Sequence, residues 1–226
     1  MQTYSHLLIT AALSIPLAVA VNSTSPKSQP FPKINTKALL FGSILPDLAL
    51  IIIAIVCIAR DWFVGVFKSP AWQQFDSSHA PTSFLLDLSW TVSLFDDWFF
   101  NHSVVITLQN TFHSPLILLA LIAICYFSWC KRAKIRSKNT CSRYSVLFWI
   151  FCAALLHTII DIPLHSTDGP LILFPFDWNY RFASPISYWD PNYYGHIWSI
   201  FEHCLDIVIL LFLIFYWRKH ITTKQD

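Results

Sequence analysis

Long apolar runs alternate with short polar segments along the chain, and five of these runs dominate the sequence. A helix needs about 20 mainly apolar residues to cross a bilayer. The runs lie at roughly 5–21, 38–59, 113–130, 145–161 and 197–217. This pattern predicts an all-α fold, a polytopic integral membrane helical bundle with about five transmembrane helices.

The segments between these runs predict how the rest of the chain is organised. NSTSPKSQPFPKINTK, residues 22–37, is rich in Pro, Ser and Lys and predicts a linker. Residues 60–112 combine aromatic side chains with Asp, which favours helices in the membrane interface. Residues 162–196 are rich in aromatics and predict an external loop or cap. We expect one membrane-embedded domain over 1–226, with 60–112 as an interfacial insertion.

Composition supports the membrane assignment. The chain has 226 residues, of which 55% are hydrophobic and 12% charged, and its mean hydropathy is +0.50. Soluble domains carry roughly 25% charged residues. The net charge of +2 is small and no long basic surface is evident, so we expect no nucleic-acid partner. None of the six cysteines forms a CxxC pair, and we interpret them as packing residues.

The first apolar run, MQTYSHLLITAALSIPLAVA, resembles a signal peptide because it ends in an A-V-A sequence. It has no basic residue at its start, where such peptides need one, and carries Tyr4 and His6 there instead. We therefore expect a retained helix.

Basic residues predict the orientation in the membrane. The segment KRAKIRSKNTCSR, residues 131–143, carries six basic residues and no acid, so we expect it in the cytoplasm. The basic tail RKHITTK and Lys27, Lys33 and Lys37 then lie on the same side, with the N-terminus outside.

Ionisable residues gather toward the non-cytoplasmic ends of the predicted helices. Asp47 is near mid-depth in the second run. A charged side chain at the centre of a membrane costs about 2.5–3.5 kcal/mol on insertion scales and usually faces a cavity or partner. Several on one side of the bilayer indicate a site. They are His6, His113, His157, Asp161, His165, Asp168, His196 and His203.

His157 and Asp161 are four residues apart, so they share one face of a helix. Imidazole nitrogen and carboxylate oxygen are ligands of catalytic zinc and similar divalent ions. A hydrogen-bonded His–Asp pair that orients the helix also explains this spacing, and the spacing alone favours that alternative.

The last apolar run adds Glu202, His203 and Asp206. Glu202 and Asp206 share a helical face. The three side chains are candidates to orient ligating imidazoles, to relay protons, or to join helices in a structural network.

In order and spacing, these motifs resemble the LexA-binding, inner membrane-associated family of predicted metal-dependent hydrolases. The resemblance covers residues 6–176 discontinuously, and the chain differs from the usual pattern at Ala49, where a second acid is common, and at Gln109 and Asn110, where His-Arg is common. The motifs are His6 in SHLLITAAL, Asp47 in GSILPD, His113 in TFHS, His157 and Asp161 in HTIID, Gly169, and Pro175–Phe176.

The resemblance implies a hydrolase of a bacterial inner membrane that uses a divalent metal ion, with zinc expected. We expect an ester, amide or phosphoester substrate, in solution or in the lipid bilayer, at the non-cytoplasmic face. The alternative is a non-catalytic membrane protein with a structural or proton-relay His/Asp network. The expected metal ligands are His6, Asp47, His113, His157 and Asp161.

Further roles complete the hypothesis. Asp161, Glu202 and Asp206 are the catalytic candidates, the two last as general base. His165, Asp168 and His203 are expected to orient ligands, and Arg181 to bind an anionic group of the substrate. The sequence predicts no oligomeric state.

Overall fold

A computed structural model describes residues 1–22, 31–69, 72, 88–134, 138–188 and 190–222. Secondary structure in these residues is helical, apart from one isolated antiparallel bridge between Leu171 and Arg181. The all-α prediction is confirmed. The main helices are α1 (Thr3–Asn22), α2 (Thr36–Gly42), α3 (Leu45–Val64), α6 (Trp90–Ser93), α7 (Phe99–Asn101), α8 (Ser103–Asn110), α9 (Pro115–Lys134), α10 (Lys138–Asp161) and α11 (Gly195–Thr222).

The chain divides into two compact units. The first consists of Met1–Pro46 and Phe112–Asp226, and the second of Asp47–Thr111. The second unit contains most of the segment predicted as an interfacial insertion. Part of that segment, including His79, lies outside the described residues, as does Lys27 in the predicted linker. Placement in the interface and the single-domain organisation stay predictions.

The predicted spans correspond to helices of the structure. Within the described residues, 4 helices are long and apolar enough to cross a membrane, or up to 5 if α2 and α3 form one broken span. The break lies at Ser43 and Ile44, between the two helices. About five spans were predicted, and this is confirmed. The remaining spans are Thr3–Asn22, Pro115–Arg132, Arg143–Leu164 and Gly195–Lys219.

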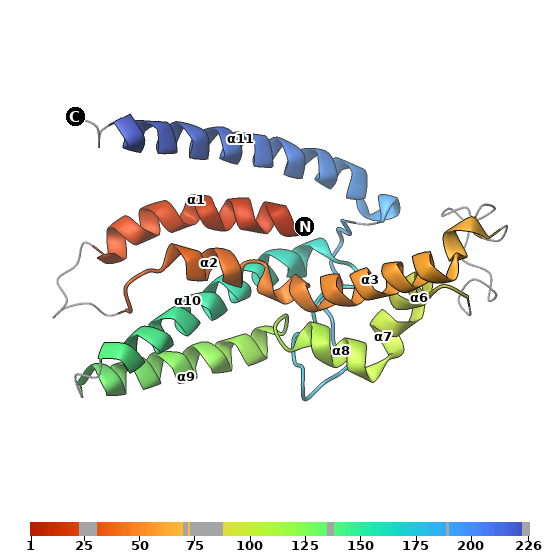
Figure 1. Cartoon of the computed structure of the whole chain (residues 1–226), viewed down its shortest axis with the longest axis horizontal. Helices are drawn as coiled ribbons and strands as arrows, with labels where there is room; N and C mark the ends of the chain where they lie inside the picture. The colour runs from red at the N-terminus through yellow and green to blue at the C-terminus, as the bar shows by residue number, and fades with distance from the viewer. Residues whose placement is uncertain (23–30, 70–71, 73–87, 135–137, 189, 223–226) are drawn as a thin grey trace. The chain divides into compact units, whose positions relative to one another are not determined.

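Five helices of the first unit lie side by side, in the order α11, α1, α2, α10 and α9 (Figure 1). The approach of α2 to α10 depends on Gly42. A Cβ atom added there would lie 2.2 Å from the carbonyl oxygen of Ile150. A side chain at this position would clash with the Ile150 backbone, so the contact requires glycine. Small residues generally let membrane helices approach closely.

Helix α1 buries its polar side chains and exposes its apolar ones. Leu13, Leu17 and Val19 are exposed. This distribution is the reverse of that in a soluble helix and suits a helix that faces lipid on one side and other helices on the other. The buried residues are Ser5, His6, Thr10 and Ser14.

An apolar core joins α2, α9 and α10. Its buried centre includes Ala38, Cys125 and Phe148. The indole of Trp149 donates from Nε1 to the carbonyl of Lys33 at 3.0 Å and so fixes the segment before α2 against α10. Asn35 caps α2 by accepting from the backbone N–H of Ala38 at 3.1 Å. The chain therefore holds α2 firmly against the helix that carries His157 and Asp161.

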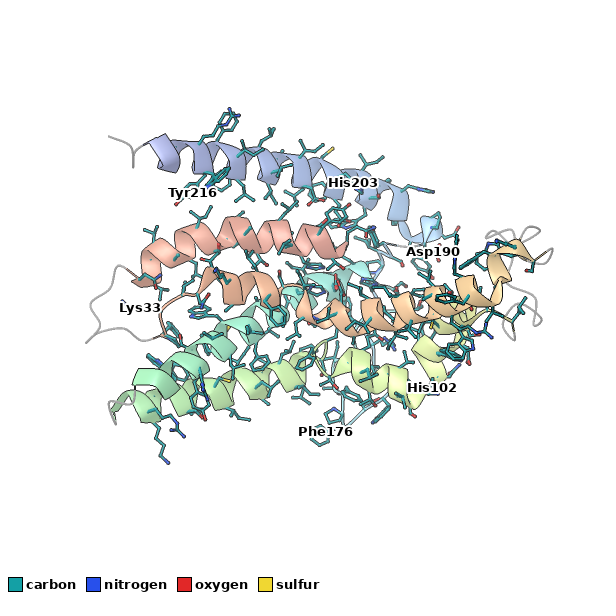
Figure 2. All side chains as sticks on the ribbon, viewed as in Figure 1. Lys33, His102, Phe176, Asp190, His203 and Tyr216 are labelled. Carbon is teal, nitrogen blue, oxygen red and sulfur yellow. The ribbon has the colours of Figure 1, made fainter. Side chains whose placement is uncertain are left out.

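The segment between α10 and α11 is mostly irregular. It begins with a short 3₁₀ helix, η3 (Ile162–Leu164), and ends with another, η4 (Pro191–Tyr193). Leu171 and Phe174 are buried, whereas Phe176 is 86% exposed (Figure 2). This segment corresponds to the predicted loop or cap at 162–196. Its location outside the membrane stays a prediction.

The basic segment 131–143 lies between two of the predicted spans, where a loop would be expected, but it is mostly helical. Helix α9 continues to Lys134 and α10 begins at Lys138, so most of the segment is helical, and 135–137 lie outside the described residues. Lys and Arg are good helix formers and favour helix C-termini, where they complement the helix dipole. A basic sequence thus marks the end of a span without requiring a long loop.

A buried acid organises the second unit. The Asp61 carboxylate accepts from the backbone N–H of Thr91 at 2.9 Å and from the hydroxyl of Ser89 at 2.7 Å. The guanidinium of Arg60 donates to it at 3.0 Å and lies over the Trp90 ring. Asp61 thereby holds the N-terminus of α6 against the end of α3. No motif in the sequence predicted this role of Asp61.

Candidate metal centre

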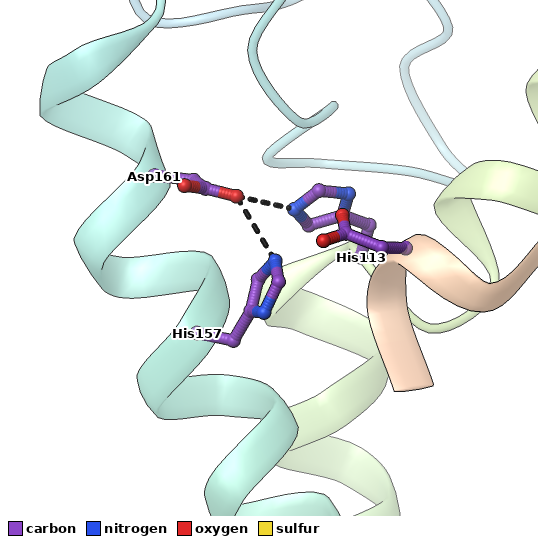
Figure 3. A group of neighbouring side chains, drawn as sticks. His113, His157 and Asp161 are labelled. Carbon is purple, nitrogen blue, oxygen red and sulfur yellow. Dashed lines mark hydrogen bonds and ion pairs between the residues drawn. The ribbon is translucent and has the colours of Figure 1, made fainter. Parts of the chain in front are cut away.

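Asp161, the last residue of α10, is the centre of a cluster of nitrogen atoms. It is 3% exposed. Its Oδ1 lies 2.9 Å from Nε2 of His6, and 3.0 Å from the α-amino nitrogen of Met1. Its Oδ2 lies 3.2 Å from Nε2 of His113 and 3.0 Å from Nε2 of His157. Figure 3 shows the His113 and His157 rings meeting this same oxygen.

Three separate elements bring these imidazoles together. His6 lies in the first turns of α1, His113 just before α9, and His157 one turn before Asp161 on α10. The ligating atoms of His113, His157 and Asp161 lie within 4.8 Å of one another. The hydroxyl of Ser114 donates to the carbonyl of Phe174 at 2.9 Å, so the segment after α10 fixes the approach to α9.

The contacts of His157 determine the protonation of its ring. Its Nδ1 lies 2.7 Å from the backbone carbonyl of Ser43, which only accepts, so Nδ1 must carry a hydrogen. In the neutral ring, Nε2 then carries a lone pair and no hydrogen. This lone pair lies 3.0 Å from Oδ2 of Asp161, which is also an acceptor. A positive charge, either a proton on one of the two atoms or a cation between them, is required at this place.

The neighbouring His6 ring limits how much of this charge protons can supply. The His6 and His157 rings are stacked, with centroids 3.6 Å apart and planes 17° apart. Two unit charges at this distance repel by about 4–5 kcal/mol at an effective dielectric constant of about 20. We therefore expect that the two rings are not both protonated.

The residues fit a divalent metal ion. Imidazole nitrogen and carboxylate oxygen form the donor set that zinc uses in catalytic sites. Ligating imidazoles usually donate their second N–H to a carbonyl or carboxylate, as His157 does to Ser43. Nδ1 of His6 and Nδ1 of His113 are buried and have no hydrogen-bond partner among the described residues. His157 is therefore the imidazole whose orientation is best determined.

A second His–Asp pair adjoins the cluster. Nδ1 of His165 lies 2.9 Å from Oδ2 of Asp168, and Nε2 of His165 lies 3.9 Å from Oδ1 of Asp161. Burial raises the pKa of Asp168, but the hydrogen bond from His165 and the charge of Arg181 outweigh it, so the pKa lies below its ordinary value. Arg181 donates from Nη1 to the carbonyl of Gly169. Asp168 is thus an ionised acceptor that can orient His165 toward Asp161.

Glu202 and Asp206 contact the other side of α1. Glu202 accepts from the backbone N–H of Gln2 at 2.7 Å, and Asp206 accepts from the hydroxyl of Ser5 at 2.8 Å. Because Ser5 and His6 are consecutive, α1 separates this pair of acids from the imidazoles around Asp161. The general-base role of the two acids stays a prediction.

The remaining predicted residues have different surroundings. Asp47 lies in the first turn of α3, at the start of the second unit, and its role as a ligand stays a prediction. His203 is exposed, and its Nε2 lies 3.4 Å from the hydroxyl of Tyr4. His196 is exposed at the start of α11.

Sequence reasoning missed two groups that matter to these clusters. One is the Ser43 carbonyl, which fixes the His157 ring. The other is Tyr188, whose hydroxyl accepts a hydrogen bond from the Gln2 side chain. A backbone carbonyl at a break between helices has no side-chain signature, and one Tyr among many aromatics is not distinctive. The one sequence feature that could have indicated the role of Ser43 is its position directly after Gly42.

Several helices long enough to span a bilayer, with a cluster of ionisable side chains buried among them, define a polytopic integral membrane protein. The sequence profile of the YdjM inner membrane protein family matches residues 1–223, and the chain belongs to this family. The predicted inner-membrane location is therefore confirmed. No curated protein and no solved structure matches the chain.

Proposed function

We propose that the protein is a metal-dependent hydrolase of the inner membrane, with a divalent ion, zinc by preference, held by His6, His113, His157 and Asp161. The observation that carries this proposal is the orientation of His157. Its Nδ1–H is donated to the Ser43 carbonyl, so its Nε2 lone pair meets the Asp161 carboxylate at a place where a proton or a cation is required, and a bound divalent ion fulfils this requirement.

A bound divalent ion would supply Lewis acidity, which polarises a carbonyl or phosphoryl oxygen and acidifies water. The chain itself supplies the ligands and a nearby base. Nε2 of His165 is the atom at which a proton would be held or moved, and Asp168 keeps the opposite nitrogen of that ring as a donor. His165 thereby gains a more direct role than the sequence suggested.

The surroundings of the cluster support one substrate class over the others. Arg181 lies near Asp168 and is partly buried, and burial lowers its pKa while the charge of Asp168 raises it. Exposed Trp178 and Tyr180 lie beside it in the chain. A guanidinium whose neighbours in the chain are exposed aromatic residues suits an anionic, partly apolar substrate, such as a lipid phosphoester. Ester and amide substrates remain candidates.

A structural role is the second candidate, and one observation favours it. Each oxygen of Asp161 already has two nitrogen atoms, from imidazoles or the amino group, within 3.2 Å. These partners come from α1 and the residue Met1 before it, from the segment just before α9, and from α10. Such a network joins helices without any metal, provided that His157 or Asp161 carries the proton between them.

The deciding experiment measures metal content and hydrolysis in the same preparation. The full chain, purified in detergent, is analysed by mass spectrometry for zinc, manganese and iron, and then tested on ester, amide and phosphoester lipids with and without chelator. We expect stoichiometric metal and turnover that chelator abolishes and added metal restores. Asp97→Asn, at an exposed acid, is the control. A metal-free preparation that turns over nothing, even with added metal, would establish the structural role.

A further inference from the structure

Two acids are buried on one face of α11. Glu202 is 1% exposed and Asp206 is 7% exposed. They are one helical turn apart, so their side chains lie on the same face of the helix. Both fall within the candidate span Gly195–Lys219. Since a carboxylate inside a membrane costs about 2.5–3.5 kcal/mol on insertion scales, two adjacent ones need a compensating positive charge.

Each acid uses one oxygen to accept a hydrogen bond from α1. Oε1 of Glu202 accepts from the Gln2 N–H, and Oδ2 of Asp206 accepts from the Ser5 hydroxyl. The other oxygens, Oε2 of Glu202 and Oδ1 of Asp206, are buried and have no hydrogen-bond partner among the described residues. A buried acceptor without a donor is costly and indicates a missing ligand.

The titratable groups around the pair come from three elements. Tyr4 of α1 and Tyr188 of the segment before α11 contribute phenols, and His203 of α11 contributes an imidazole. Burial, followed by the charges of Glu202, Tyr4 and Asp206, raises the pKa of Tyr188 to about 12. None of these three groups carries a permanent positive charge, and the α-amino group of Met1, which is next to Gln2, is paired with Asp161. His203 is exposed to the surroundings, so it neutralises the pair poorly.

We propose that Glu202 and Asp206 share one proton and form a proton-binding site between α11 and α1. Two adjacent carboxylates resist ionising together, so one of them retains a proton. A single hydrogen shared between Glu202 and Asp206 supplies the donor that their unpartnered oxygens lack. The site takes a proton because its two free ligand atoms are too few for a metal ion, which needs four or more.

This site is independent of the proposed hydrolase. Its hydrogen bonds run to Gln2 and Ser5, whereas the imidazole of the adjacent His6 contacts Asp161. Loss of the shared proton leaves a second negative charge against the first turns of α1. Protonation of the pair therefore acts on the helix that also carries His6.

The test uses dicyclohexylcarbodiimide, an apolar reagent that reacts with protonated carboxyl groups inside membranes. The acid proton passes to a carbodiimide nitrogen, the carboxyl oxygen adds to the central carbon, and rearrangement leaves a stable N-acylurea. The full chain in lipid vesicles is treated at several values between about pH 6 and pH 9, digested, and mapped by mass spectrometry. We expect labelling at Glu202 or Asp206, the two buried acids of α11.

Variants and added cations separate the possible outcomes. Glu202→Gln should restrict the label to Asp206, and Asp206→Asn should restrict it to Glu202. Asp97, which is exposed, should react only with a water-soluble carbodiimide. Absence of label from both buried acids at every pH would overturn the proposal, as would protection by sodium or magnesium ions at constant pH. Metal content of both variants should equal that of the wild type, so failure here leaves the hydrolase proposal intact.

Discussion

Two buried polar clusters lie on opposite sides of α1, and they differ in the balance of charge. Around Asp161 one carboxylate meets three imidazoles and an amino group. Around Glu202, two carboxylates meet a backbone N–H and a hydroxyl. The first cluster is rich in nitrogen lone pairs and suits a divalent metal. The second lacks a cation and suits a proton. We propose different ligands for the two sites because different groups accompany the acids, and an acid alone specifies no ligand.

Asp161→Asn should have the largest effect and would break the first cluster alone. The amide retains the shape of the side chain but removes the charge that pairs with the imidazoles. We expect metal affinity to fall by more than about 100-fold, because even residues that only orient ligands contribute 10–100-fold. Metal content and hydrolysis are measured by titration and turnover.

Asp206→Asn is the matched control for this change, since it removes a buried acid from the second cluster. It should leave metal affinity unchanged. An equal loss of metal in both variants would show that the two clusters are one site, and unchanged metal in Asp161→Asn would show that Asp161 is not a ligand.

Gly42→Ala should disturb the first cluster through the backbone. The added Cβ would lie 2.2 Å from the Ile150 carbonyl, so α2 must move away from α10 and carry the Ser43 carbonyl from His157. Overpacking of this kind costs about 1–3 kcal/mol. We expect lower resistance to denaturant and weaker metal binding.

Gly65→Ala provides the comparison for that variant. Gly65 has φ +79°, and an added Cβ would meet nothing within 4 Å, so the substitution costs backbone strain of about 1–2 kcal/mol without a steric clash. It should lower stability but not metal affinity. If both glycine variants weaken metal binding equally, the effect is general destabilisation and the Ser43 contact does not orient His157.

Asp168→Asn should have an intermediate effect and would separate metal binding from catalysis. Its carboxylate orients His165, which does not need to hold the metal. We expect turnover to fall by about tenfold with metal content unchanged. Asp177→Asn is the control, because Asp177 accepts from the backbone N–H of Asn179 in the same segment. Loss of metal in Asp168→Asn would assign His165 to the ligands.

The lowered pKa of Asp168 also predicts that the stability of the protein depends on pH. Its pKa is held below the ordinary value by His165 and Arg181, so its contribution to stability is fully present above that ordinary value of 3.8. The contribution is lost as pH falls through the lower pKa of the folded protein. Asp168→Asn should therefore flatten the acid limb of a denaturation profile between about pH 5 and pH 2.

The sequence predicted the helices and which ionisable residues are unusual, but not how those residues divide between clusters. Helical spans follow from local composition, which is why the five apolar runs correspond so directly to helices. His6 and Ser5 are adjacent in the chain but contact different helices, and helical periodicity alone does not identify those partners. The role of Ser43 depends on a backbone carbonyl exposed at a helix break, which no side-chain motif encodes.

The smallest effect is expected in the second cluster, from Glu202→Gln. The carboxamide keeps an oxygen for the Gln2 N–H and supplies an N–H donor to the free oxygen of Asp206, replacing the shared proton. Stability at neutral pH should change by less than about 1 kcal/mol, as for an exchange in which both partners remain satisfied. Glu202→Leu, which supplies no donor and leaves the Gln2 N–H unpaired, should be less stable by about 1–3 kcal/mol. Denaturation in detergent compares the two. Equal losses in both variants would mean that a shared proton does not join the acids, and that the interface between α1 and α11 depends on packing alone.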